Sequence, residues 1–68
     1  MHYFDYESAA KQAGIPDDKL ALICELVRKD YPDDDNLYEL HVLRACLSVR
    51  DGRTTVEKIL KDTLAGKP

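Results

Sequence analysis

The chain has no hydrophobic run that approaches the roughly 20 residues a helix needs to cross a bilayer. It also has no basic segment followed by an apolar leader after Met1, which predicts a cytoplasmic rather than a secreted protein. Its only cysteines, Cys24 and Cys46, allow at most one bridge, so the chain is not a disulfide-rich scaffold. Both fall at apolar positions of predicted helices, where a thiol packs as a small hydrophobe. We expect two buried thiols, with a bridge or a reactive thiol as the alternatives.

Motifs that carry chemistry are also missing. There is no glycine-rich phosphate loop and no CxxC pair of the kind found in zinc sites. The acidic run 33–35 lacks the central glycine and the terminal glutamate of a calcium-binding EF-hand loop. His41 and Cys46 are five residues apart, and such residues point to different faces of a helix, so they do not form a nucleophile–base pair. We expect no enzymatic activity, no cofactor and no metal site.

The length of 68 residues predicts one domain over 1–68, with 1–4 and 65–68 as flexible ends. A chain this short buries only about 60% of the surface that its unfolded form exposes. A core of this size rarely supplies more than roughly 3–5 kcal/mol, and small domains therefore often depend on oligomerisation.

Proline and glycine divide the chain into four helical segments, predicted at 5–13, 17–30, 34–50 and 54–64. No useful stretch alternates apolar and polar residues with period two, so we expect no strand. The connections are short, and consecutive helices should pack as neighbours. The predicted fold class is all-α, a compact bundle of four short helices packed around the third.

Side-chain caps are expected at three of the helix starts. Asp5 suits the start of the first helix, and either Asp34 or Asp35 suits the start of the third. Thr54 and Glu57 have the spacing of a capping box for the fourth helix.

The third helical segment is the most apolar part of the chain. Between residues 37 and 49 only four residues are polar, and three of these, His41, Arg44 and Ser48, share one narrow face of a 3.6-residue helix. Three short neighbours cannot comfortably cover so much apolar surface. We therefore expect a homodimer or a partner protein.

Residues 8–23, SAAKQAGIPDDKLALI, resemble a helix-turn-helix unit. Ala10 is the small residue that would let the second helix approach closely, and Gly14 is the glycine of the turn. The resemblance implies DNA binding, but the start of the recognition helix carries Asp17 and Asp18. Two carboxylates there would be repelled by phosphates.

Charge is distributed unevenly. Residues 1–40 hold ten acids and four bases, a balance of −6, whereas residues 41–68 hold three acids and six bases, a balance of +3. Such polarity favours head-to-tail self-association or a charged partner. A surface for a phosphate or an acidic partner is predicted at Arg44, Arg50, Arg53, Lys58 and Lys61.

Two tyrosines, Tyr31 and Tyr38, flank the acidic linker PDDDN and form a second candidate partner surface, because tyrosine combines a large contact area with a polar tip. Together these patterns predict a small non-catalytic interaction or regulatory module that binds a partner protein or itself through helix faces. The alternative is a DNA-binding regulator that uses residues 8–26 or the basic surface within 44–67.

Overall fold

The computed structural model describes the backbone of residues 4–65 and the side chains of residues 4–61. Within this part the chain forms four helices and no strand, which confirms the all-α prediction. In chain order they are α1 (Tyr6–Ala13), α2 (Asp17–Asp30), α3 (Asp35–Arg50) and α4 (Val56–Ala65).

The first and third helices begin at the expected caps. An Asp5 carboxylate oxygen accepts a hydrogen bond from the Ser8 amide at 3.1 Å, and an Asp34 oxygen accepts one from the Leu37 amide at 3.0 Å. Each bond satisfies one of the amides that the first helical turn leaves without a backbone partner. Of the two candidate caps for α3, the structure selects Asp34.

The predicted cap of the fourth helix is wrong by one residue. The Thr55 hydroxyl, not that of Thr54, accepts the hydrogen bond from the third helical residue, Lys58, at 3.1 Å. A capping box needs a glutamate or glutamine at that third position, and Lys58 cannot reciprocate. Glu57 instead lies within the first turn, where its charge suits the positive end of the helix.

Two helices end at glycines in the left-handed region. Gly14 has φ 73° and Gly52 has φ 77°, conformations that residues with a Cβ rarely adopt. After Gly14 the amide of Ile15 bonds back to the Ala10 carbonyl at 2.9 Å, which completes a Schellman ending. Both terminations match the sequence prediction.

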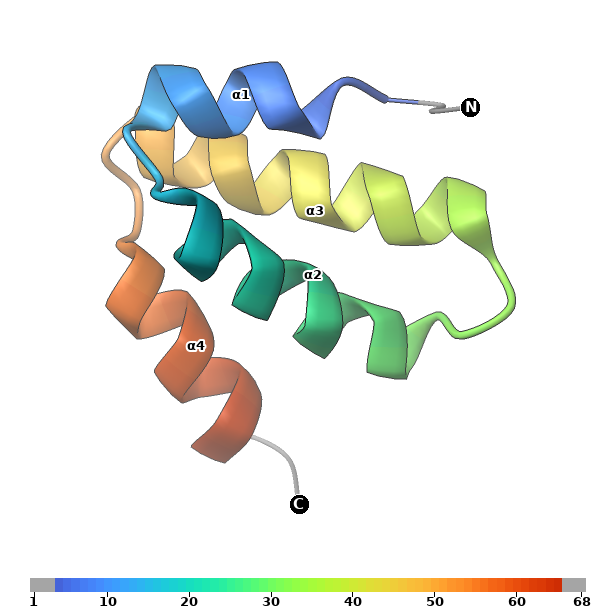
Figure 1. Ribbon diagram of the computed structural model, residues 1–68. Helices are drawn as coiled ribbons and strands as arrows, with labels where there is room; N and C mark the ends of the chain where they lie inside the picture. Colours follow the sequence, from blue (N-terminus) through green and yellow to red (C-terminus); the bar gives the residue numbers. More distant parts are fainter. Residues whose placement is uncertain (1–3, 66–68) are drawn as a thin grey trace.

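The third helix lies between α1 and α2, and α4 continues from its far end (Figure 1). α4 packs against α2, whereas the sequence predicted that it would pack against the third helix. α1 packs chiefly on α3, and its two buried residues are Ala9 and Ala10. These small side chains therefore serve the approach of α1 to α3, whereas the sequence assigned Ala10 to a close crossing of the first two helices.

The core is small. Its buried hydrophobic residues come from all four helices and the first turn: Ala9, Ala10, Ile15, Ile23, Val42, Cys46 and Val56. Four leucines of the described residues neither belong to this core nor pack against it: Leu22, Leu26, Leu37 and Leu40. In the described part of the chain, no helix has both the length and the apolar character needed to cross a membrane.

Phe4, predicted to lie in a flexible end, is held by a long-range contact. Its amide donates to a carboxylate oxygen of Glu39 at 3.1 Å, across 35 positions of sequence. This bond holds the segment that enters α1 against α3.

Candidate interaction surface

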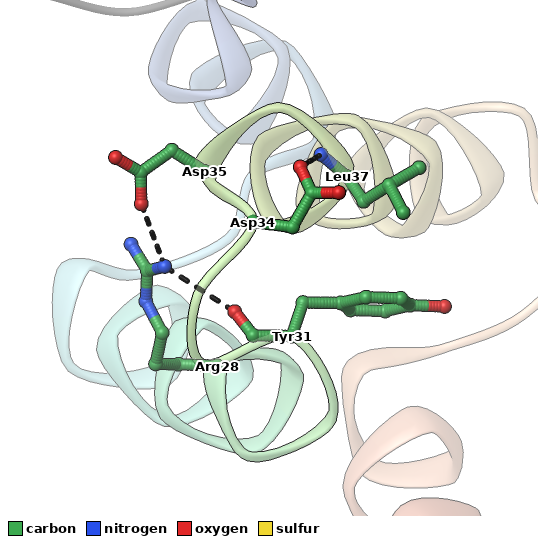
Figure 2. A network of polar contacts seen from close by, with 5 residues as sticks. All are labelled: Arg28, Tyr31, Asp34, Asp35 and Leu37. Atoms are coloured by element: carbon green, nitrogen blue, oxygen red, sulfur yellow. Dashed lines mark hydrogen bonds and ion pairs between the residues drawn. The ribbon is translucent and has the colours of Figure 1, made fainter.

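One side of α3 is turned away from α1 and α2. The buried residues of α3 are Glu39, Val42 and Cys46, which share a face by their spacing of three and four. Opposite them lies what we call the outer face, formed by Leu37, Leu40, Arg44, Leu47 and Ser48. Figure 2 shows Leu37 and Asp35 pointing to opposite sides of α3.

The first half of the outer face is apolar. Leu37 is 39% exposed, and Leu40 is half-buried without packing against the core. Leu47, farther along, is half-buried and does pack against the core. Single exposed leucines are ordinary on protein surfaces, but an exposed leucine with a half-buried one a turn further on gives this helix face a small apolar binding surface.

The second half of the outer face is basic. Arg44, Leu47, Ser48, Asp51 and Arg53 line a shallow hollow of about 240 Å³. Arg53 reaches this position because the chain reverses at Gly52, with the Arg53 amide bonded to the Ser48 carbonyl at 2.9 Å. Among the described residues, neither the Arg44 nor the Arg53 guanidinium has a hydrogen-bond or ion-pair partner.

The other predicted cations do not join this hollow. Arg50 points towards α1, where it donates to Gln12 at 3.0 Å and pairs with Asp51 at 3.2 Å. Lys58 and Lys61 are exposed on α4, which packs against α2. Of the five residues predicted to form one anion surface, the structure thus brings two together.

The acidic linker lies at the opposite end of α3. Asp34 caps the helix, and Asp35 pairs with Arg28 of α2 at 2.8 Å (Figure 2). Asp33 is exposed, and no partner for it is found in the described part of the chain. α3 therefore has an exposed carboxylate before its first turn, and two arginines, Arg44 in its second half and Arg53 beyond its end, near its other end.

The two predicted partner-surface tyrosines make separate contacts. The Tyr31 ring stacks on His41 with ring centres 4.6 Å apart. The Tyr38 ring packs edge-to-face against Tyr6 at 6.4 Å, and the Arg28 guanidinium lies 3.8 Å above its centre. The two rings thus pack against different residues, and Tyr38 links α3 to α1 through Tyr6 and to α2 through Arg28.

His41 is held by hydrogen bonds on both ring nitrogens. Its Nδ1 lies 2.8 Å from the Leu37 carbonyl, which can only accept, so this nitrogen carries the proton of the neutral ring. Nε2 is then free to accept from the Tyr31 hydroxyl, 3.2 Å away. His41 thus joins the end of α2 to α3.

The two thiols are free but differ in environment. Cys46 is fully buried, whereas Cys24 is half-buried. Burial, assisted by the nearby Cys24, raises the pKa of Cys46 to about 11, so Cys46 is a neutral thiol at physiological pH. Burial and a hydrogen bond with Cys24 also raise the pKa of Tyr38 above its usual value. These groups are packing elements and not activated nucleophiles.

A second, larger hollow of about 480 Å³ opens where the α1–α2 turn meets the start of α4. Its lining is mostly small or apolar and includes Ala13, Gly14, Pro16 and Val56. Its charged lining residues are Lys19 and Glu57. The described residues that line this hollow include no pairing of nucleophile and base.

The residue that sequence reasoning missed is Glu39. It was counted among the polar residues of the third helix, yet it is 5% exposed and accepts the Phe4 amide. A signal was present in the sequence, since Glu39 has the same helical spacing as Val42 and Cys46, on the apolar side. A carboxylate on such a face must find hydrogen-bond donors.

No protein-family model, curated protein or solved structure matches this chain. Within the described residues, no three His, Cys, Asp or Glu side chains lie close enough together to hold a metal ion.

Proposed function

We propose that this protein is a non-catalytic interaction module that binds a partner protein, or a second copy of itself, through the outer face of α3. The observation that carries the proposal is the exposure of Leu37, with the half-buried Leu40 one turn further on, beside two arginines that have no partner within the described residues. Two free thiols favour action in a reducing compartment such as the cytoplasm.

The energetics of the outer face support binding. Covering the exposed part of Leu37 removes apolar surface from water. At the usual free energy per unit of buried apolar area, this contributes about 1–2 kcal/mol to binding. Charged groups around such an apolar centre set the orientation and the choice of partner. Arg44 and Arg53 favour a partner with a carboxylate at the edge of its contact surface.

Binding to DNA receives less support. Asp17 and Asp18 are both exposed at the start of α2, the helix that would enter the groove. Their charges would lie against the phosphates, where DNA-binding proteins place arginine and lysine. The basic residues in the second half of the chain lie in three separate places. Arg44 and Arg53 line the hollow, Arg50 contacts Gln12, and the described lysines lie on α4, so they do not form one continuous basic stripe.

The proposal can be tested by site-specific photo-crosslinking in the cells that make the protein. A photoreactive phenylalanine derivative replaces Leu37 in one variant and Leu22, a comparably exposed leucine on α2, in the other. We expect a discrete adduct from position 37 and none from position 22. An adduct of twice the chain mass identifies a second copy, and another mass identifies a different protein. Equal crosslinking from both positions, or none, would refute the proposal.

A further inference from the structure

The outer face has opposite charges at its two ends. Asp33 lies exposed two residues before the first residue of α3, the hollow lined by Arg44 and Arg53 lies towards the other end of the helix, and Leu37 and Leu40 lie between them in the sequence. Leu37 and Leu47 are ten residues apart, which corresponds to about 15 Å of helix. An occupant of this face must match both the apolar middle and the two charged ends.

We propose that the occupant is a second copy of this chain, with the two α3 helices antiparallel across a two-fold axis. The Asp33 carboxylate of each copy then lies in the hollow between Arg44 and Arg53 of the other. This inference rests on the proposed function, because it takes the outer face of α3 as the binding surface and specifies the partner.

The antiparallel orientation of the two α3 helices follows from the charges at their ends. A two-fold axis across α3 brings the start of one helix to the end of the other, so each Asp33 meets arginines, and this contact is made twice. In a parallel arrangement Asp33 would face Asp33 and Arg44 would face Arg44. Like charges in such close contact destabilise an interface. The antiparallel arrangement is the one that satisfies both ends.

The arginine hollow is suited to a carboxylate. Two guanidinium groups present planar arrays of donors, a geometry that recognises carboxylates well. The Ser48 side chain adds a hydroxyl to the lining, and Asp51 is already engaged by Arg50. The hollow lies towards the carboxyl end of α3, where the helix dipole stabilises the two arginine cations, so the attraction for a carboxylate comes from the guanidinium groups and not from the helix.

The size of the molecule allows this pairing. The structure measures 32 × 28 × 19 Å and exposes 4719 Å². A standard interface covers about 800 Å² of each partner, roughly a sixth of this surface. One helix face supplies less than that area, so we expect a dissociation constant of micromolar order. A domain with so small a core also gains stability from pairing.

Sedimentation velocity on the intact chain tests the inference. The protein is measured from about 10 µM to about 1 mM as the wild type, as Asp33→Lys and as Arg44→Glu. We expect a wild-type dimer and at least a tenfold weaker dimer for each variant, because both reversals place like charges together. An equimolar mixture of the two variants should form a heterodimer. At one end of it the introduced lysine meets the introduced glutamate, and at the other end the native Asp33 meets the native Arg44.

Two controls separate charge pairing from other effects. Asp18→Lys changes the net charge as Asp33→Lys does, at an exposed position on α2, and should leave the dimer unchanged. Added salt should weaken the wild-type dimer through screening of its charged ends. Both reversed positions are exposed, and circular dichroism confirms that each variant is folded.

The outcomes that contradict the inference are distinct from failure of the proposed function. A wild type that stays monomeric to about 1 mM overturns self-pairing, as does a dimer that both variants retain or that their mixture does not restore. If the chain is monomeric while crosslinking from Leu37 yields an adduct of another mass, the interaction module stands and the second copy is excluded. If neither experiment detects a complex, both proposals fail.

Discussion

The Arg28 guanidinium lies 3.8 Å above the centre of the Tyr38 ring. The same side chain, through one nitrogen, donates to the Asp35 carboxylate at 2.8 Å and to the Tyr31 carbonyl at 3.3 Å. Arg28 therefore connects the last turn of α2, the linker and the first turn of α3 (Figure 2). A flat guanidinium can lie over a ring while its edge donates hydrogen bonds, and the compact ammonium of lysine lacks this geometry.

Replacing Arg28 should destabilise the fold. We expect Arg28→Ala to lower the free energy of unfolding by about 1–2 kcal/mol, through loss of the ring contact and of a mostly exposed ion pair. Arg28→Lys should recover less than half of that loss. Asp35→Asn, which removes only the ion pair, should cost less than about 1 kcal/mol. Urea unfolding followed by circular dichroism measures all three variants, and equal losses for Asp35→Asn and Arg28→Ala would contradict the role of the ring.

The cap of α4 provides a second test. Thr55→Ala removes the acceptor of the Lys58 amide and should destabilise the protein by about 1 kcal/mol. Thr54→Ala deletes the same atoms one residue earlier and should have a smaller effect. Amide hydrogen exchange in the first turn of α4 reports the loss locally. A larger effect of Thr54→Ala would contradict the Thr55 cap and support the capping box that was predicted from the sequence.

Stability should fall at alkaline pH because of Cys46. Its pKa is about 11 in the folded protein and 9.0 ordinarily, so the folded state favours the neutral thiol. The stabilisation is complete below pH 9.0 and is lost as the pH rises to about 11, because the unfolded chain releases its proton first. The difference between the two pKa values corresponds to roughly 3 kcal/mol.

Chemical unfolding at a series of pH values measures this effect. The pKa values of Tyr6 and Tyr38 are raised as well, chiefly by burial, so a further decrease is expected above their ordinary value of 10.0. Cys46→Ala is the control, and it should flatten the curve between pH 9.0 and about 11 while the tyrosine effect persists. An unchanged slope in this variant would assign the alkaline loss to other groups.

Duplex DNA should not bind tightly. A mobility assay at low salt should show no shifted band, because Asp17 and Asp18 are exposed on the helix that would enter the groove. The double variant Asp17→Asn, Asp18→Asn is the informative comparison, since it removes the repulsion and leaves the helix start neutral. A wild-type shift that weakens as salt rises would favour the DNA-binding alternative.

Local sequence was sufficient to predict most of the helix bounds. The start of α1 at Asp5, its end at Gly14 and the end of α3 at Gly52 all depend on atoms within a few residues of each position. A carboxylate that reaches an amide three residues ahead, or a glycine that adopts a positive φ, needs no distant contact. The choice between Thr54 and Thr55 could not be made in this way, because each threonine is followed three positions on by a backbone amide that could donate to it, and the glutamate that favoured Thr54 does not fix which hydroxyl accepts.

The candidate site depended on the fold. In the sequence Arg44, Arg50 and Arg53 are equivalent cations near one turn, but the reversal at Gly52 places Arg53 beside Arg44, and Gln12 of the distant α1 draws Arg50 away. Which neighbour approaches a side chain depends on how the helices pack, and that arrangement joins residues far apart in the chain.

The sequence alone determined that this protein is made of short helices and where most of them start and stop, because hydrophobic periodicity, caps and turn residues act over one or two helical turns. Tertiary structure alone decided that Ala10 packs against α3, that Glu39 is buried and accepts the Phe4 amide, and that Leu37 on the outer face of α3 stays exposed among the described residues. Each of these outcomes is set by competition among helices for a core too small to cover every apolar face.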